Sequence, residues 1–204
     1  MAQGSNFWDR KYRTPSFVYG RQPNRFLVDV APALLGSGAR VLSLGEGEGR
    51  NAVWMARQGW SVTAVDYSRE ALAKLDEFAR RCGVEIEIHR ADAVQFDAGA
   101  ERWDSVVLLH IHLAPERRRR LHEKVVRALR PGGVLLLEML RCEQQAQPTG
   151  GPERRELLYT ADELQRDFGT LHICRLVEED RSIDAGEHQG MTSVVNLVAT
   201  KEWG

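Results

Sequence analysis

The sequence has few cysteines and almost no net charge. Its 204 residues contain only three cysteines, Cys82, Cys142 and Cys174, which lie far apart. An odd and scattered set of cysteines suits neither a disulfide framework nor a zinc site, so we expect free thiols in a reducing cytoplasm and no bound metal. The 28 Lys and Arg residues offset 29 Asp and Glu residues to a net charge of -1. This balance disfavours a general nucleic-acid partner.

Long apolar runs are also missing. The longest ones, around 106–111 and 134–140, are interrupted by His110 and Glu138 and are far shorter than the roughly 20 residues that a membrane helix needs. The first eleven residues lack the apolar segment of a signal peptide. Internal repeats and low-complexity tracts are absent as well. We therefore expect a cytoplasmic protein with no membrane span. We also expect a monomer or a homodimer.

What the sequence does contain is a regular alternation of short apolar runs with helical periodicity. The periodicities predict strands at 40–44, 61–65, 84–89, 103–109, 134–140, 171–177 and 193–200, the last two as a hairpin. They predict helices at 23–35, 51–58, 115–129 and 160–168, and one between Ser68 and Gly83. Alternating strands and helices imply right-handed crossovers and a parallel sheet that binds ligands beyond the carboxyl ends of its strands.

Residues 1–36 and 141–159 do not follow this alternation. Residues 1–36 are expected to cover the site, while 141–159, and also 180–192, are predicted loops. The chain is accordingly interpreted as one domain over 1–204, with a core at 37–204 and an N-terminal cover at 1–36.

A glycine-rich turn directly follows the first predicted strand. Gly45, Gly47 and Gly49 permit positive φ angles and let a ligand approach backbone N–H groups at the start of the next helix. A dinucleotide fingerprint would need a third glycine where Arg50 stands, which opposes an NAD-binding protein. No Gly-Lys-Ser/Thr follows for a phosphate-binding loop. Glu46 and Glu48 suit a ligand that carries an ammonium or a sulfonium group.

Two acidic residues follow the next two strands. Asp66 ends the second strand, 21 residues after Gly45, where a carboxylate accepts hydrogen bonds from both ribose hydroxyls of a nucleoside. Asp92 follows the third strand and is a candidate acceptor for the exocyclic amine of adenine. The alternative for each is an ordinary local role, at a helix N-terminus for Asp66 and in a turn for Asp92.

Five motifs in this order resemble those of class I S-adenosylmethionine-dependent methyltransferases. They are VLSLGEGEG at 41–49, VTAVDYS at 62–68, ADA at 91–93, WDSVVL at 103–108 and LRPGG at 129–133. Further segments resemble the small tellurite-resistance (TehB-like) methyltransferases: FWDRKY at 7–12, FVYG at 17–20, PN at 23–24, GRN at 49–51, HLAP at 112–115, LYT at 158–160 and GMTSVVNLVA at 190–199.

The resemblance implies a Rossmann-like α/β fold with S-adenosylmethionine as cofactor and S-adenosylhomocysteine as product. The sheet would have seven strands in the order 3-2-1-4-5-7-6, mostly parallel with an antiparallel last strand and with helices on both faces. The resemblance places the turn from Gly45 to Gly49, with Glu46 and Gly47, around the methionyl part, Asp66 on the ribose, Asp92 near the adenine and His110 beside the sulfonium. Asn51, Tyr67, Ser68 and Ala93 are further implied cofactor contacts.

The sequence also departs from the family pattern. Glu46 stands where many relatives carry a small residue or cysteine, and no Asn/Asp-Pro-Pro-Tyr signature follows the fourth strand. Methylation of amides or of base amino groups is therefore not expected.

The methyl acceptor is predicted to be a small, soft nucleophile such as a chalcogen oxyanion or a thiol. An anionic nucleophile needs no general base, whereas O- or N-methylation of a small metabolite would need His112 or His188 as one. Trp8, Phe17 and Tyr19 are candidates for closing the site and contacting the acceptor, and Arg50 for attracting an oxyanion. A nucleoside-binding sensor or interaction module without catalysis stays open as a third interpretation. The basic run 117–120 is expected to be a solvated helix face.

Overall fold

The structure is a computed structural model that describes residues 5–186 and 188–203 of the chain. Its strands are β1 (Arg40–Leu44), β2 (Ser61–Asp66), β3 (Glu87–Arg90), β4 (Trp103–Leu109), β5 (Leu129–Leu140), β6 (His172–Ala185) and β7 (His188–Thr200). Its helices are α1 (Ser5–Tyr12), α2 (Arg25–Val30), α3 (Arg50–Arg57), α4 (Arg69–Cys82), α5 (Pro115–Ala128) and α6 (Ala161–Asp167). Short 3-10 turns lie at Ala31–Ala33, Cys142–Ala146 and Arg155–Leu157.

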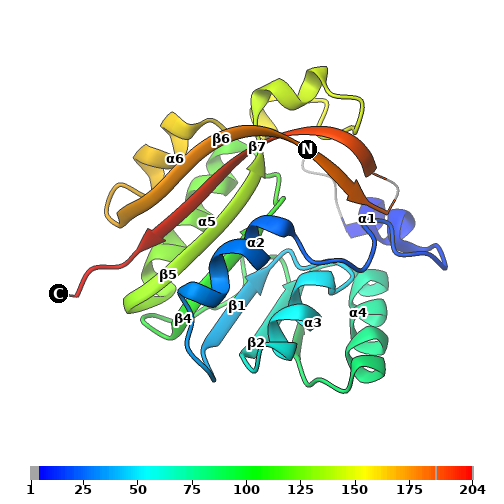
Figure 1. Cartoon of the computed structure of the whole chain (residues 1–204), viewed down its shortest axis with the longest axis horizontal. Helices are drawn as coiled ribbons and strands as arrows, with labels where there is room; N and C mark the ends of the chain where they lie inside the picture. The colour runs from blue at the N-terminus through cyan, green and yellow to red at the C-terminus, as the bar shows by residue number, and fades with distance from the viewer. Residues whose placement is uncertain (1–4, 187, 204) are drawn as a thin grey trace.

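The strands form one seven-stranded sheet in the order β3-β2-β1-β4-β5-β7-β6. Neighbouring strands from β3 to β5 are parallel, while β7 runs antiparallel to both β5 and β6. Figure 1 shows this sheet with helices on both of its faces. The predicted fold class and strand order are confirmed.

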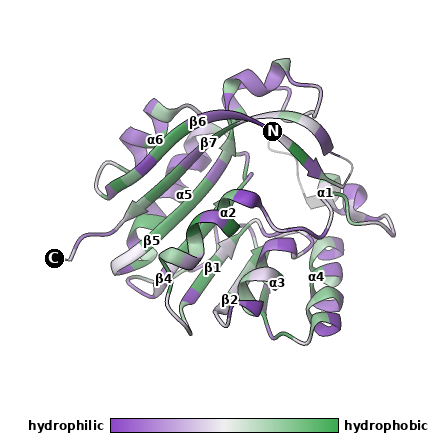
Figure 2. Ribbon diagram, viewed as in Figure 1, coloured by the Kyte–Doolittle hydropathy of each residue, from purple (hydrophilic) through white to green (hydrophobic). Residues whose placement is uncertain are grey.

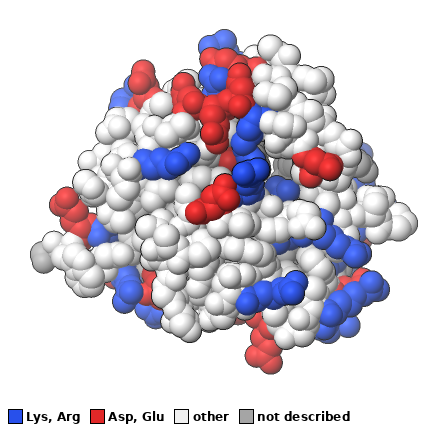
Figure 3. Space-filling view, in the orientation of Figure 1, with Lys and Arg blue, Asp and Glu red and all other residues white. Residues whose placement is uncertain are grey.

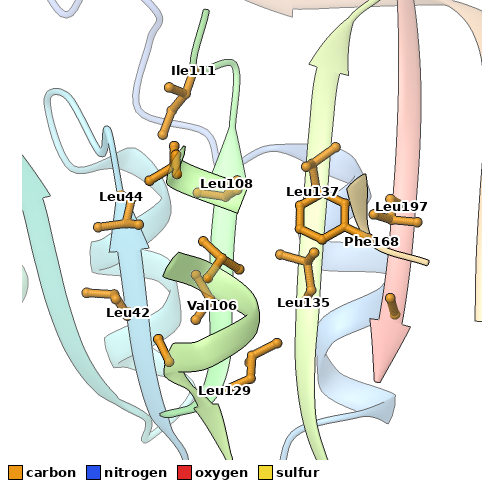
Figure 4. Packing of buried hydrophobic residues seen from close by; sticks show 14 of the residues in the cluster. Leu42, Leu44, Val106, Leu108, Ile111, Leu129, Leu135, Leu137, Phe168 and Leu197 are labelled. Atoms are coloured by element: carbon orange, nitrogen blue, oxygen red, sulfur yellow. The ribbon is translucent and has the colours of Figure 1, made fainter. Parts of the chain in front are cut away.

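Alternate residues of the central strands bury opposite faces of the sheet. Leu42 and Leu108 join the side chains of α5 and α6, whereas Val41 and Val107 join those of α2, α3 and α4. Figure 2 shows the central strands as the most hydrophobic part of the ribbon. In the close-up of Figure 4, Phe168 lies beside Leu137 and Leu197 on the α6 side. The two clusters hold the strand ends in fixed register.

The parallel register brings the functional loops to one edge of the sheet. Leu44, the last residue of β1, pairs with Val65, and Asp66 pairs with Arg90. The loops after β1, β2, β3 and β4 therefore emerge side by side, where a parallel sheet binds its ligands.

The largest difference from the sequence prediction lies in the last hairpin. Residues 180–192 were expected to be a loop, but β6 and β7 pair along 13 registered positions out to Ala185 and His188. Exposed charged residues alternate with half-buried ones in the distal part of β6, so this segment lacks the apolar run that predicts a strand. The pairing of its backbone with β7 supplies the hydrogen bonds that define the strand instead.

The N-terminal region also differs in detail. The predicted helix at 23–35 is shorter, because Pro32 has no backbone N–H with which to continue it, and a 3-10 turn follows α2. The short helix α1 was not predicted. Strand β3 begins later than expected, at Glu87, and β5 begins earlier, at Leu129. Within the described ranges no helix is long and apolar enough to cross a membrane.

Candidate active site

The glycine turn between β1 and α3 has the backbone conformation that its sequence predicts. Gly45, Gly47 and Gly49 have φ angles of 68°, 69° and 92°. A Cβ atom at Gly45 would lie 2.6 Å from Cγ1 of Ile111, and one at Gly49 would lie 3.1 Å from Cα of Leu75. Both the left-handed backbone and the close neighbours therefore require glycine at these two positions.

Glu46 lies buried beneath this turn. Its Oε1 accepts hydrogen bonds from the backbone N–H groups of Asn51 and Ala52, at 3.2 and 2.8 Å, and its Oε2 accepts one from Ser43. Burial raises the pKa of Glu46 to about 7, although these donors oppose the shift. The carboxyl thus caps the start of α3 from inside the protein, where an anionic ligand group would otherwise bind.

Asp66 joins the ends of two loops at the carboxyl edge of β2. Its Oδ2 accepts the N–H of Gly47 at 2.9 Å, and its Oδ1 accepts the N–H of Ser68 at 2.8 Å. Burial raises its pKa above the usual value for aspartate. Each carboxylate oxygen can accept more than one hydrogen bond, so Asp66 can hold the loops and still accept two ribose hydroxyls.

The neighbours of Asp66 have local roles of their own. The Ser68 hydroxyl donates to Asp9 of α1 at 2.7 Å and caps α4 by accepting the N–H of Ala71. Burial raises the pKa of the Tyr67 phenol, and the charge of Asp66 adds to this shift.

Asp92 lies after β3, on the same edge of the sheet. Its carboxylate accepts the N–H of Val94 at 2.8 Å and pairs with Arg117 of α5. Ala93 packs against the hydrophobic cluster on the α5 side. The turn is thus anchored from both sides, beside the strand that carries Asp66.

His110, which follows β4, takes part in a buried polar cluster. Its Nε2 lies 3.1 Å from Oε1 of Glu138 on β5. The same oxygen accepts hydrogen bonds from Asn24 Nδ2 and from Arg181 Nη2 of β6, each at 2.6 Å. Sequence reasoning missed Glu138 and Arg181, because the first lies in an apolar run and the second in a predicted loop.

The other two histidines that the sequence singled out have different surroundings. His112 is half-buried, with its Nε2 out of contact with water, and its Nδ1 lies 3.0 Å from the carbonyl oxygen of Leu157. Burial lowers the pKa of His112 to about 3, which makes it a weak base near neutral pH. His188 lies 2.8 Å from the carbonyl of Thr149 through Nδ1, and its ring stacks on Tyr19 at 4.7 Å.

The N-terminal segment covers the glycine turn. The hydroxyl of Tyr12 lies 3.2 Å from where a Cβ of Gly47 would be. Glu48 accepts the N–H of Val18 at 2.9 Å and binds Lys74 of α4 at 2.7 Å. These contacts fix residues 5–24, the described part of the predicted cover that precedes α2, to the glycine turn and to α4. Below, the cover means these residues.

The predicted contact residues of the cover are brought to this region in different ways. Trp8 stacks on Tyr12, whereas Phe17 packs against Phe78 of α4. Arg50 donates to the carbonyl oxygen of Tyr19. The Asn51 side chain accepts the backbone N–H of Asn24 at 2.8 Å, so it binds the cover directly.

The arginines at 117–120 in α5 differ from the sequence prediction. A solvated face was expected, but Arg118 is buried, donates to the carbonyl of Leu158 and to Glu163, and lies over the Tyr159 ring. A guanidinium with such partners tolerates burial. Arg118 therefore fixes the segment before α6 to α5.

A family model described as a methyltransferase domain matches residues 41–133. Curated relatives, among them the following two, match about half of the chain. An uncharacterised protein of Mycobacterium bovis is 29% identical over 115 residues, which are 56% of this chain and 42% of that protein. A ribosomal RNA small subunit methyltransferase C of Alcanivorax borkumensis is 36% identical over 108 residues, 50% of this chain and 33% of that protein. The chain thus spans less than half the length of these relatives.

Solved structures resemble nearly the whole chain. One, described as converting a disulfide bond into a thioacetal group during echinomycin biosynthesis, has a TM-score of 0.80 at 22% identity and covers 98% of this chain and 92% of its own. TehB from Haemophilus influenzae has a TM-score of 0.73 at 20% identity, over 97% and 67%. A SAM-dependent methyltransferase from Methanosarcina mazei has a TM-score of 0.72 at 19% identity, over 86% and 98%. At these identities the likeness concerns the fold.

The residues of the site fit S-adenosylmethionine, the cofactor that these matches imply. The glycine turn has no room for side chains at Gly45 and Gly49, and Asp66 keeps acceptor capacity for a ribose. Glu46 occupies the N–H groups at the start of α3 that a phosphate would otherwise bind. Residues 41–133 thus match a methyltransferase domain model, and the sheet that contains them has the Rossmann-like fold that the chain shares with S-adenosylmethionine-dependent methyltransferases of known structure.

Proposed function

We propose that the chain transfers a methyl group from S-adenosylmethionine to a small, soft nucleophile at the carboxyl ends of β1, β2 and β4. The observation that carries the proposal is the junction at Asp66, whose carboxylate accepts the N–H of Gly47 and that of Ser68. This junction fixes the glycine turn against the end of β2 and leaves further acceptor sites for a nucleoside.

The chain's own residues would bind the cofactor and exclude water from it. The cofactor supplies an activated methyl group on a sulfonium. Positioning a reactant beside such a group is worth roughly 7 to 11 kcal/mol in favourable cases. The cover, held by Glu48 and Lys74, lies over the turn that would bind the methionyl part.

Two observations favour a small and soft acceptor. The solved structure with the TM-score of 0.80 comes from a protein described by its sulfur chemistry. On the face drawn in Figure 3, positive and negative side chains are interspersed, which gives little attraction for a polyanion. A thiol or a chalcogen oxyanion agrees with both observations.

The cofactor half of the proposal is tested by calorimetric titration with S-adenosylmethionine, S-adenosylhomocysteine and NAD. The wild-type protein should bind the first two with micromolar affinity and should not bind NAD. Asp66→Ala should weaken the binding of S-adenosylmethionine and of S-adenosylhomocysteine by at least about 100-fold. It removes hydrogen bonds to a charged group that are worth roughly 1.5 to 3 kcal/mol each. Asp76→Ala, on the exposed side of α4, serves as the matched control and should bind normally.

The catalytic half is tested with radiolabelled cofactor over a panel of thiols and oxyanions. Label in an acceptor supports the proposal. Tight binding of the cofactor without label transfer to any acceptor would favour a nucleoside-binding sensor instead, and binding of NAD alone would contradict the cofactor assignment.

A further inference from the structure

The residue after β4 has a left-handed backbone conformation. His110 has a φ of 57°, in the left-handed region that a residue other than glycine rarely occupies. Its backbone N–H donates to the carbonyl oxygen of Glu138 at 2.9 Å, which ties it to β5. Such outliers persist only where their surroundings enforce them, and they concentrate at functional sites.

The contact with Glu138 determines which ring nitrogen of His110 carries a hydrogen. The Glu138 side chain is fully buried, and donors from three elements lower its pKa to about 2 despite its burial. Nε2 lies 3.1 Å from this carboxylate and must donate to it, since two acceptors would repel. The contact from Asn24 Nδ2 to Nε2 is longer, at 3.4 Å, and that amide already donates to Glu138. Neutral His110 therefore has its lone pair on Nδ1.

Nδ1 of His110 is available to a ligand. Among the residues that the structure describes, no group is hydrogen-bonded to it, and the side chain is 29% exposed. In His112, by contrast, desolvation lowers the pKa to about 3, and Nδ1 of both His112 and His188 lies against a backbone carbonyl. Of these three histidines, His110 alone combines an orienting carboxylate with a free ring nitrogen.

We propose that His110 is the general base of the reaction, held by Glu138 as its positioning residue, and that the acceptor is a thiol that must lose its proton. This inference rests on the proposed function and narrows its acceptor class. The proton of the thiol moves to Nδ1 of His110, the freed electron pair forms the bond to the methyl carbon, and the methyl–sulfonium bonding pair leaves with the cofactor's sulfur. Glu138 stabilises the imidazolium that results.

A chalcogen oxyanion would use the site differently, because it carries no proton to remove. The charged and titratable groups that face the pair are Arg181 of β6, Arg50 of α3 and His112 of the same loop. Arg181 neutralises Glu138 in part, and Asn24 of the cover adds a neutral donor. The geometry thus provides a polarised acceptor nitrogen for a proton, which a thiol needs and an oxyanion does not.

The experiment compares two thiols that differ in ionisation at pH 7, with radiolabelled S-adenosylmethionine as donor. 2-Mercaptoethanol is protonated at this pH, and 4-nitrothiophenol is already a thiolate, which is the reactive form. His110→Asn, chosen because asparagine tolerates the left-handed backbone, should reduce kcat with 2-mercaptoethanol by about 100-fold or more. It should change kcat with 4-nitrothiophenol by less than about fivefold, since that thiolate needs no base.

A second variant and a control separate catalysis from structure. Glu138→Gln should lower kcat with 2-mercaptoethanol and leave kcat with 4-nitrothiophenol nearly unchanged, because it removes the anion that stabilises the imidazolium while the thiolate needs no base. His89→Asn, which removes the exposed histidine of the His89–Glu87 pair on β3, is the matched control and should leave both rates unchanged.

The outcomes distinguish this inference from the proposed function. Equal losses with both thiols, or no loss with either, overturn the assignment of His110, provided that calorimetry shows normal cofactor binding. Wild-type protein that binds the cofactor and methylates an oxyanion but neither thiol overturns the thiol class alone. Failure of the wild type to bind S-adenosylmethionine overturns the proposed function itself.

Discussion

At the scale of single residues, the candidate site depends on carboxylates that lie out of contact with water. Glu46, Glu48, Asp66 and Glu138 are all buried, and each accepts hydrogen bonds from backbone or side-chain donors. A buried carboxylate costs much free energy unless such donors compensate it. Their pKa values diverge accordingly, with that of Glu46 raised to about 7 and that of Glu138 lowered to about 2.

The raised pKa of Glu46 predicts how the stability of the protein depends on pH. Because the folded pKa of about 7 lies above the ordinary value of 4.5, the folded state binds the proton more tightly than the unfolded state. The contribution of protonated Glu46 to the free energy of unfolding is therefore lost as the pH rises from 4.5 to 7, by up to about 3 kcal/mol.

Glu46→Gln removes this titration and keeps an oxygen for the N–H groups of α3. We expect its free energy of unfolding, measured with urea at pH 5 and pH 8, to fall less with rising pH than that of the wild type. Equal pH dependence in the two proteins would mean that Glu46 is ionised across this range, contrary to the expected protonation.

Single residues also decide what the sequence can reveal about the site. Gly45, Gly47, Gly49 and Asp66 are predictable because each lies in a motif whose spacing has a physical reason. Glu138 gives no such signal, because its neighbours in β5 are apolar. Its importance comes from the approach of Asn24 and Arg181, which are 114 and 43 residues away in the sequence. Only the folded chain brings these three together.

At the scale of elements, the β6–β7 hairpin closes on the cover. A Cβ atom at Gly186 would lie 2.5 Å from the backbone nitrogen of Gly20 and 2.5 Å from the carbonyl oxygen of Val18. The Tyr19–His188 stack lies at the same contact. Figure 1 shows the distal end of the hairpin reaching toward the N-terminal segment. The hairpin thus extends past the sheet to contact the cover directly.

Gly186→Ala should separate these two elements. Its Cβ clashes with backbone atoms, which have less freedom to move than a side chain. We expect faster proteolysis of the cover and faster dissociation of S-adenosylmethionine in stopped-flow experiments, beyond the roughly 1 kcal/mol that a left-handed alanine costs.

Gly83→Ala is the matched control for this substitution. Its φ of 66° is close to the 61° of Gly186, but a Cβ there meets nothing within 4 Å. It should therefore lose similar backbone stability while the cover stays protected. If both variants release the cofactor at the same rate, the hairpin contact does not hold the cover.

The elements also show where reading the sequence fails. Strands β1, β2 and β4 were predicted because they are short, mostly apolar runs, and the helix predicted at 160–168 begins at a capping box of Thr160 and Glu163. The distal hairpin arms and α1 are polar, and they are stabilised by their partners more than by their own periodicity. Patterns of hydrophobicity detect segments that face the core, and these segments do not.

At the scale of the whole molecule, the site is assembled from both ends of the chain. The methyltransferase family model matches 41–133, the part that contains the glycine turn, Asp66 and His110. The cover lies before this range, and the β6–β7 hairpin and Glu138 lie after it. The cofactor half of the site is therefore recognisable from sequence, whereas the groups that would face the acceptor come together only through tertiary contacts.

The two hydrophobic clusters on opposite faces of the sheet predict that stability and cofactor binding can be separated. Phe168 is fully buried in the cluster on the α6 side, on the face of the sheet opposite to α2, α3 and α4. Phe168→Ala should lower the free energy of unfolding by roughly 3 to 5 kcal/mol because it leaves a cavity in a close-packed core. Cofactor at 100 times its Kd should still stabilise this variant by about 2.7 kcal/mol, as in the wild type, because ligand stabilisation depends on the site alone.

Asp66→Ala should show the opposite behaviour, with stability changed less and the ligand effect lost. Thermal unfolding of the three proteins with and without S-adenosylmethionine measures both quantities. A ligand effect that also disappears in Phe168→Ala would mean that the α6 side of the core and the strand ends form one cooperative unit in which the geometry of the site depends on distant packing.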